Sequence, residues 1–169
     1  GKITNRGIEL TLNATPIKRN GFTWQTTLNL AHNKNKVNRL SNDIYKVDRF
    51  TQGDPNVAGV SSEGFTQRII EGEPLGTFYT FQFAGYNESG KAVYYTRDEN
   101  GNLDGNTTTA PEYKDRTITG CAQPDLNLGW NNTLTYKKFS LNMFFTGVFG
   151  NDVYNSARAN YTSPQMFSD

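Results

Sequence analysis

The sequence contains a single cysteine, Cys121, and a single histidine, His32, among its 169 residues. One cysteine excludes an intrachain disulfide. Nothing else in the sequence supports a Cys–His nucleophile pair, and the simpler interpretation is a thiol at a loop end and an imidazole in a loop or at an interface. Paired carboxylates, a metal-ligand cluster and a phosphate-binding loop do not stand out either. The sequence therefore predicts a protein that is not an enzyme and that has no cofactor.

The chain also lacks any run of about 18 apolar residues, which excludes a transmembrane helix. Its mean hydropathy of −0.68 is compatible with membrane strands, because such strands alternate apolar and polar residues. The net charge is only +1, which gives no case for nucleic acid as a partner. A short basic cluster at 34–39 is interpreted as a solvated loop after a strand, in preference to an anion site.

Residues 122–155 are the most informative stretch, because apolar and polar residues alternate along both of its halves. This period indicates a sheet with one apolar side. Each half is about ten residues or more, whereas a globular strand has about 5–6 and a tilted strand needs about 9–11 to cross a bilayer. The apolar positions are Leu126, Leu128, Trp130, Leu134, Tyr136, Phe139, Leu141, Met143, Phe145 and Phe149.

A turn at Lys137-Lys138 joins these two strands. A two-residue loop there, or a four-residue loop closing on Thr135 and Ser140, gives one register that pairs apolar with apolar positions. The longer loop avoids Lys-Lys in a type I′ turn, which favours Asn-Gly. The predicted pairs are Tyr136 with Phe139, Leu134 with Leu141, and Trp130 with Phe145.

An earlier segment repeats this design around Arg19-Asn20-Gly21. A two-residue Asn-Gly loop would pair apolar with polar positions, so we predict a three-residue loop with Gly21 in the left-handed region. The predicted pairs are Lys18 with Phe22, Leu12 with Leu28, and Leu10 with Leu30. Trp24, close to this turn, is expected to anchor the periplasmic membrane interface.

The two hairpins organise the chain into residues 6–32 (first hairpin), 33–120 (extracellular loop region), 123–150 (second hairpin) and 151–169 (start of another loop). Tight turns on one side and long loops on the other are typical of outer-membrane barrels. We therefore predict an all-β fold with about four long antiparallel strands of a large transmembrane β-barrel. The alternative is a soluble secreted β-sandwich that binds glycans, in which shorter strands bury their apolar faces against each other.

The long loop region is expected to contain strands of its own, at Thr77–Ala84 and Lys91–Thr96, with a turn at Asn87–Gly90. It is rich in aromatic side chains, on which sugar rings could stack, although packing within the loop is the simpler explanation. The candidate substrate-binding residues are Phe78, Tyr79, Tyr86, Tyr94 and Tyr95.

A turn-rich stretch at 98–106 alternates oxygen-bearing side chains and invites comparison with a calcium loop. An EF-hand requires Gly at its sixth position and Glu at its twelfth, where this sequence has Leu103 and Thr109. We predict a turn without a metal. The weak candidate ligands are Asp98, Asn100, Asn102 and Asp104.

Several motifs together resemble the SusC/RagA-type TonB-dependent outer-membrane receptors. They are Gly120 with AQPD (122–125), GWNNTLTYKKF (129–139), GVFGNDVYN (147–155), and EGEPLGTFYTFQFAG (71–85). IELTLNATPIK and FTWQTTLNLAHNKNKV look like the preceding hairpin of the same family. The similarity covers most of the chain in the expected order, and the combination is specific where each motif alone is weak.

The resemblance implies a barrel of 22 strands with an N-terminal plug, located in the bacterial outer membrane in contact with its lipid. It implies import of glycans or peptides, energy from the TonB complex, and a SusD-like surface lipoprotein at the extracellular mouth. This chain would supply about four strands from the C-terminal half of the barrel and one large outer loop, without the plug or the TonB-contact segment. Because it has no signal peptide at Gly1 and ends at Ser168-Asp169, we interpret it as a piece of a longer protein.

Overall fold

The computed structural model describes residues 1–41, 49–52, 65–155 and 157–158. Almost all the regular structure in these ranges is antiparallel β-strand, which confirms the all-β prediction. No helix in the described ranges is long and apolar enough to cross a membrane. The elements are β1 (Lys2–Arg19), β2 (Phe22–Arg39), β3 (Arg49–Gln52), β4 (Gln67–Ile70), β5 (Thr77–Phe81), β6 (Phe83–Tyr86), β7 (Ala92–Arg97), β8 (Leu103–Thr108), η1 (Tyr113–Asp115), β9 (Arg116–Cys121), β10 (Leu126–Tyr136) and β11 (Phe139–Phe149).

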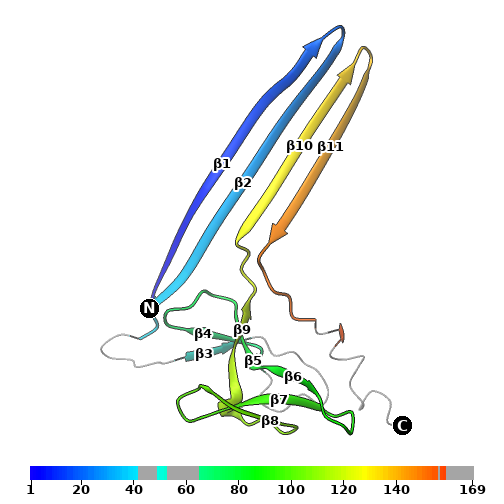
Figure 1. Ribbon diagram of the computed structural model, residues 1–169. Helices are drawn as coiled ribbons and strands as arrows, with labels where there is room; N and C mark the ends of the chain where they lie inside the picture. The colour runs from blue at the N-terminus through cyan, green and yellow to red at the C-terminus, as the bar shows by residue number, and fades with distance from the viewer. Residues whose placement is uncertain (42–48, 53–64, 156, 159–169) are drawn as a thin grey trace.

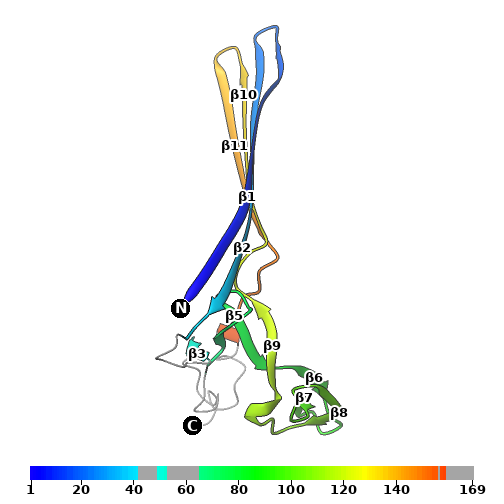
Figure 2. The same cartoon turned by 90° about the vertical axis from the view of Figure 1, so that its left-hand side faces the viewer.

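The four long strands form one sheet in the order β1-β2-β10-β11, with every neighbouring pair antiparallel. β1 and β2 have 18 residues each, and β10 and β11 have 11 each. Figure 1 shows the two hairpins side by side with their turns at the same end, and Figure 2 shows the same sheet nearly edge-on. The four strands thus form part of a barrel wall. The β-sandwich alternative is wrong, because both hairpins lie in one sheet and do not face each other.

The turn of the first hairpin corrects our prediction. Arg19 pairs with Phe22, so the loop has only two residues, Asn20 and Gly21. Their φ values of 51° and 75° are those of the Asn-Gly turn that best matches the twist of a hairpin. The predicted pairing of Lys18 with Phe22 is wrong, whereas the pairings of Leu12 with Leu28 and of Leu10 with Leu30 are confirmed.

A β-bulge reconciles the tight turn with the apolar register. The pairing shifts by one residue between Ala14 and Ile17, so that Thr15 and Pro16 together stand opposite Gln25. Pro16 has no N–H to donate to the strand ladder, and bulges are one of the few places where a sheet accepts proline. The extra residue returns Leu12 to the face that also carries Leu28.

The turn of the second hairpin matches the two-residue alternative. Tyr136 pairs with Phe139 around Lys137-Lys138, and the predicted pairs of Leu134 with Leu141 and of Trp130 with Phe145 are confirmed. Lys137 accepts the left-handed conformation, at a φ of 53°. Its N–H donates to the carbonyl of Gly21 at 2.9 Å, which ties the two turns together at one end of the wall.

The residues of the wall divide between two faces that the register fixes. β2 and β10 pair so that Leu30 lies beside Leu128, and Leu28 beside Trp130. Most of the large apolar side chains of the four strands therefore share one side of the wall, which we call the outer face, whereas Phe144 and Val148 lie on the opposite, inner face. On the outer face the exposed side chains are Ile8, Leu10, Leu12, Ile17, Trp130, Tyr136, Phe139, Leu141, Phe145 and Phe149.

The described part of the long loop region forms two small sheets, the outer sheets, at the end of the wall opposite the turns (Figures 1 and 2). One has the order β3-β4-β5-β9 and the other β6-β7-β8. The strand predicted at Thr77–Ala84 is split, because the chain changes sheets at Gln82, whose carbonyl accepts from the N–H of Tyr95 at 3.0 Å. The predicted turn at Asn87–Gly90 is present, with Asn87 Oδ1 accepting from the N–H groups of Ser89 and Lys91.

β1 and β2 extend past the expected 6–32 hairpin at the end away from the turn. β1 begins at Lys2 and β2 continues to Arg39, so the basic cluster at 34–39 is strand, and its interpretation as a loop is wrong. The alternate residues Asn35 and Val37 are half-buried and fully buried. Residues 72–75 dock there, with Val37 N–H donating to Glu73 O at 2.9 Å and Leu75 N–H to Asn35 Oδ1 at 2.8 Å.

Candidate functional site: a two-faced wall and its outer sheets

The inner face of the wall carries mostly neutral hydrogen-bonding side chains, with Glu9 and Lys18 as charged exceptions. Thr11 donates to Asn29 Oδ1 at 2.9 Å, Thr27 to Asn13 Oδ1 at 2.8 Å, and Thr133 to Asn142 Oδ1 at 2.7 Å. A hollow of about 370 Å³ lies beside the bulge. A sheet exposed to bulk water usually carries more charge, so this face has the chemistry of a surface that meets other polar protein groups.

Phe144 interrupts the polar alternation of the inner face. A Cβ placed on Gly129, across the β10–β11 pair, would meet the Phe144 ring at 3.8 Å. The aromatic ring therefore lies against the strand where a side chain is missing, as aromatic residues often do opposite glycine in sheets. Phe144 is still 67% exposed, so most of its side-chain surface is uncovered on the inner face.

Two tryptophans share a polar spot on the otherwise apolar outer face. Trp24 Nε1 donates to Asn132 Oδ1 at 3.0 Å, and Trp130 Nε1 donates to Thr26 Oγ1 at 2.9 Å. Asn132 is only 3% exposed. Both indole N–H groups are satisfied by the protein, so these tryptophans need no partner from the solvent.

The candidate substrate-binding aromatics do not all lie together. Phe83 packs edge-on against Tyr86 and Tyr94, with ring centroids 5.3 and 6.1 Å apart, and Tyr94 also packs against Phe81 at 6.0 Å. Apart from Phe81, at the end of β5, this cluster lies on the β6–β7 pair. Tyr86 is 72% exposed, so its ring is open to a ligand, and the sequence analysis had not singled out Phe83 as its neighbour.

The other three candidates have different surroundings. Phe78 is only 8% exposed, and its ring offers little surface to a ligand. Tyr79 lies under the guanidinium of Arg68, whose carbon is 4.6 Å from the ring centroid. Tyr95 is half-buried in the middle of β7. Phe78 and Tyr79 therefore contribute to packing within the four-stranded outer sheet.

The 98–106 stretch forms turns stabilised by its own carboxylates. Asp98 Oδ1 accepts from the N–H groups of Asn100 and Asn102 at 2.9 and 2.8 Å. These bonds, the one from the Asn102 N–H first, lower the pKa of Asp98. Asp104 accepts from the Thr96 hydroxyl at 2.6 Å and from the Asn106 N–H at 2.9 Å, and its pKa is also lowered. Among the described residues, no three His, Cys, Asp or Glu side chains group as metal ligands.

The motif residues around 120–125 and 150–155 meet where the outer sheet passes into the wall. Asp152 N–H donates to Cys121 O at 2.7 Å, and Asp152 Oδ2 accepts from the Cys121 N–H at 2.9 Å. A Cβ on Gly120 would clash with the Asp152 carboxylate, and one on Gly150 with Asp125. The glycines therefore leave the space that these carboxylates fill, and the motif residues hold this junction together.

Cys121 and His32 each have partners of their own. Cys121 Sγ donates to Leu75 O at 3.8 Å, and His32 Nδ1 lies 2.5 Å from Asp125 O. Both residues belong to the junction between the wall and the outer sheet. These contacts fit structural roles and not a nucleophile pair.

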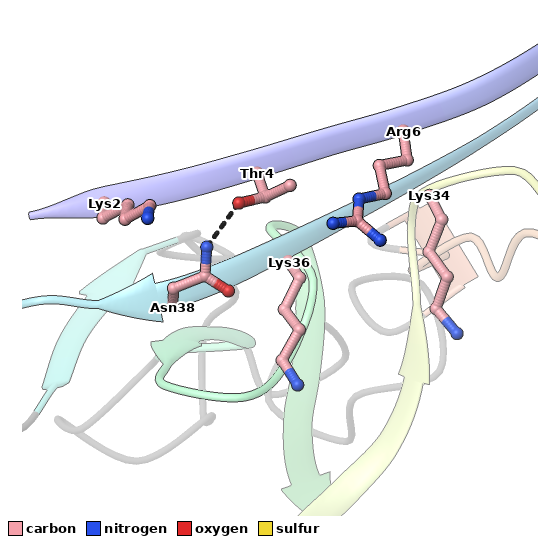
Figure 3. A pocket seen from close by; sticks show the side chains of 6 residues that line it. All are labelled: Lys2, Thr4, Arg6, Lys34, Lys36 and Asn38. Atoms are coloured by element: carbon pink, nitrogen blue, oxygen red, sulfur yellow. Dashed lines mark hydrogen bonds between the residues drawn. The ribbon is translucent and has the colours of Figure 1, made fainter.

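A basic hollow at the open end of the first hairpin was missed by the sequence analysis as a site. It measures about 470 Å³ and is lined by Lys2, Thr4, Arg6, Lys34, Lys36 and Asn38, which we call the outer basic patch (Figure 3). The available signal was the recurrence of basic or neutral polar residues at alternate positions, at 2, 4 and 6 and again at 34, 36 and 38. This signal indicates a common patch only when the two segments are known to be paired strands.

Comparisons with known proteins agree on one family. No protein-family model matches the chain. It is similar to TonB-dependent receptor P3 of Formosa agariphila, with 33% identity over 165 residues that cover 92% of this chain and 16% of that protein. TonB-dependent receptor P26 of the same organism is 34% identical over 176 residues, covering 95% of this chain and 16% of that protein.

Two further comparisons identify the type of receptor. TonB-dependent receptor SusC of Bacteroides thetaiotaomicron is 26% identical over 175 residues, covering 100% of this chain and 16% of that protein. The solved structure of the RagAB peptide transporter matches the fold with a TM-score of 0.68, at 22% identity over 88% of this chain and 15% of that chain. The chain spans about one sixth of the length of these relatives. It belongs to the SusC/RagA-type TonB-dependent receptors.

Proposed function

We propose that this chain is part of the wall of an outer-membrane importer that takes up glycans or peptides with energy from the TonB complex. The observation that carries the proposal is the two-faced sheet of β1, β2, β10 and β11, which is mostly apolar on one side and mostly neutral and polar on the other. Such a sheet fits lipid outside and a plug or solute pathway inside. The role is transport, with no chemical turnover by this chain.

The height of the apolar face supports a membrane location. Outward residues run from Phe22 to His32 along β2, which is ten residue steps. At about 3.4 Å per step this is roughly 34 Å along the strand, and a tilt of about 40° reduces it to about 26 Å. An outer-membrane barrel has an apolar band of about 25 Å.

The orientation follows from the lengths of the connections. The two tight turns, at Asn20-Gly21 and Lys137-Lys138, are placed on the periplasmic side, and the two small sheets on the extracellular side. There they would meet a SusD-like surface lipoprotein and the incoming solute. Tyr86 and Tyr94 are the proposed contacts for an oligosaccharide or peptide, because Tyr86 is open and Tyr94 adjoins its cluster.

Cysteine labelling in native membranes tests the location of the wall. In the parent receptor with Cys121→Ser, single cysteines on the outer face are expected to resist a membrane-impermeant maleimide. A cysteine at the exposed turn residue Ser89 is the reactive control. Strong labelling of the whole set would overturn the membrane wall. The set is Leu10, Leu12, Leu28, Leu30, Leu128, Leu134, Leu141 and Met143.

Deletion of the parent gene tests import. We expect growth to be lost on one complex glycan or peptide mixture and kept on the corresponding monomers, because the monomers do not need this receptor to cross the outer membrane. The identity of that nutrient would distinguish glycan from peptide. Unchanged growth on every complex nutrient tested would contradict the importer role.

A further inference from the structure

The outer basic patch lies on the lipid-facing side of the wall, directly beyond the apolar band. Along β1 and β2 the outward rows are Leu10 with Leu30, Ile8 with His32, and then Arg6 with Lys34 and Thr4 with Lys36. The change from apolar to cationic occurs within one row. On the opposite face at this level, Val37 is fully buried where residues 72–75 dock. The cationic side chains therefore lie on the outer face.

The patch carries four cations, with no compensating anion among the residues that the structure describes. Lys2, Arg6, Lys34 and Lys36 are all exposed, and none of the described residues that line the patch is acidic. None of the four side chains makes a hydrogen bond or ion pair with another residue in the part of the chain that the structure describes. Within the described ranges, the one hydrogen bond between lining side chains runs from the Asn38 side-chain amide to the Thr4 hydroxyl, which are both neutral (Figure 3).

The register makes this arrangement unfavourable by itself. Arg6 pairs directly with Lys34 across the two strands, and like charges directly opposite each other destabilise an antiparallel pair. An anion between the two would reverse the sign of this interaction. Arg6 adds a planar guanidinium that binds phosphate oxygens in a bidentate manner, and the lysines add flexible point charges.

The level of the patch identifies the source of that anion. The Arg6–Lys34 row is two residues beyond the Ile8–His32 row, so it lies about 7 Å further along the strand and about 5 Å higher in the membrane at the same tilt. The interfacial layer occupies about 5–8 Å on each side of the hydrocarbon core. The cations therefore begin in the headgroup layer, and their apolar stems can lie along the lipid while the charges reach that layer.

We propose that the outer basic patch binds the phosphate groups of a phosphorylated glycolipid headgroup in the outer leaflet. The inference rests on the proposed orientation of the wall, with the small sheets outside the cell. The proposal gives a function to the basic cluster at 34–39, which we had interpreted from the sequence as a solvated loop. The bound lipid fixes the height of the first hairpin in the membrane.

Binding of labelled lipid A, a bisphosphorylated diglucosamine lipid, tests the proposal on the complete receptor in neutral detergent. Each cation near an anionic lipid surface contributes about five-fold in affinity, equivalent to about 1 kcal/mol. Arg6→Gln/Lys34→Gln is therefore expected to weaken binding roughly 25-fold. The matched control, Lys18→Gln/Lys91→Gln, removes the same charge outside the patch and is expected to bind normally. Lys2→Gln/Lys36→Gln provides a second patch variant if the first fails to assemble.

Two comparisons separate the lipid from other anions. Dephosphorylated lipid A is expected to bind weakly and equally to the receptor, the patch variants and the control. Millimolar inorganic phosphate is expected not to displace lipid A, because it lacks the headgroup and the acyl chains. Displacement by free phosphate, equal binding by patch and control variants, or selective loss of the surface lipoprotein from the patch variants would each overturn the proposal.

Failure of this inference is distinguishable from failure of the importer proposal. The binding assay measures lipid, whereas the labelling and growth experiments measure the wall and transport. A receptor that imports its nutrient normally, yet binds lipid A with equal affinity in patch and control variants, would refute the lipid site alone. Reactivity of the outer leucines to the impermeant reagent would refute the orientation on which both proposals rest.

Discussion

Single residues explain how a polar group is tolerated on the outer face of the wall. Asn132 stands at a position where its strand otherwise presents leucine or an aromatic residue, and it is buried because Trp24 lies over it and donates a hydrogen bond to its side chain. Trp130 and Thr26 repeat the arrangement in the neighbouring position. Without water nearby, an unpaired N–H is costly, so each indole needs its partner.

Replacing Asn132 tests this pairing. We expect Asn132→Ala to lower the stability of the assembled barrel by about 1–3 kcal/mol, because the Trp24 N–H would be left without its acceptor. The neighbouring Asn131→Ala is the control, since its side chain is exposed on the other face. The measurement is the temperature at which the folded band is lost in semi-native electrophoresis. Equal shifts for the two variants would contradict the assigned hydrogen bond.

The Asp98 turn has a predictable dependence on pH. Its pKa is lowered from 3.8 in the folded state, so its stabilisation is fully present above pH 3.8 and is lost as the pH falls through the lower, folded pKa. Protection of the Asn100 and Asn102 amides from hydrogen exchange is expected to fall in that acidic window. Asp98→Asn removes the charge and is expected to reduce the protection at neutral pH.

Calcium provides a second measurement on the same turn. Because the Asp98 carboxylate already accepts two backbone N–H groups, added Ca²⁺ is expected to leave the exchange of these amides unchanged. A calcium-dependent rise in protection that is lost in Asp98→Asn would contradict the metal-free turn.

Whole elements show which features the sequence could predict. The alternation of Leu126–Tyr136 and of Phe139–Phe149 was enough to fix the β10–β11 register, because a shift by one residue would move every apolar side chain to the wrong face. The first turn was predicted incorrectly because the same argument assumed uninterrupted pairing. Thr15 and Pro16 absorb one residue, and proline within a strand pattern was the available signal for a bulge.

Deleting one residue tests the role of the bulge. Removal of Pro16 is expected to pair Thr15 with Gln25 in an uninterrupted ladder, so that Leu12 still pairs with Leu28 and Leu10 with Leu30 on the outer face. The assembled fraction of the receptor in the outer membrane is then expected to stay near normal. Insertion of one alanine between Asn13 and Ala14 is the contrasting variant, because it turns Leu10 and Leu12 toward the interior and is expected to lower the assembled fraction sharply. A sharp loss on removal of Pro16, or equal assembled fractions in the two variants, would contradict this role of the bulge.

The sequence could not predict which residues far apart along the chain lie close together in the fold. The outer basic patch joins residues 2–6 to residues 34–38, and the junction joins Gly120 and Cys121 to Asp152. Local patterns contain no information on these distances until the strands are paired. The aromatic candidates divided for the same reason, since the break at Gln82 placed Phe78 and Tyr86 in different sheets.

At the scale of the whole molecule, the four-stranded wall is open on both sides. β1 and β11 are edge strands, and Leu12 and Leu141 on the outer face are 52% and 54% exposed. Open edges pair with other chains, and a large apolar face is covered by a partner or by lipid. In a closed barrel, further strands pair with both edges and lipid covers the face.

These features predict how the 169-residue chain behaves on its own. We expect it to aggregate or to require detergent, because exposed apolar surface costs about 25 cal/mol per Å² in water. Light scattering in detergent-free buffer would measure its size, and the same chain in detergent micelles is the control. Labelling of cysteines at positions 12 and 141 would report whether the outer face is covered. A stable monomer with both positions freely reactive in detergent-free buffer would show that the face needs no cover, and would contradict a wall built to meet lipid.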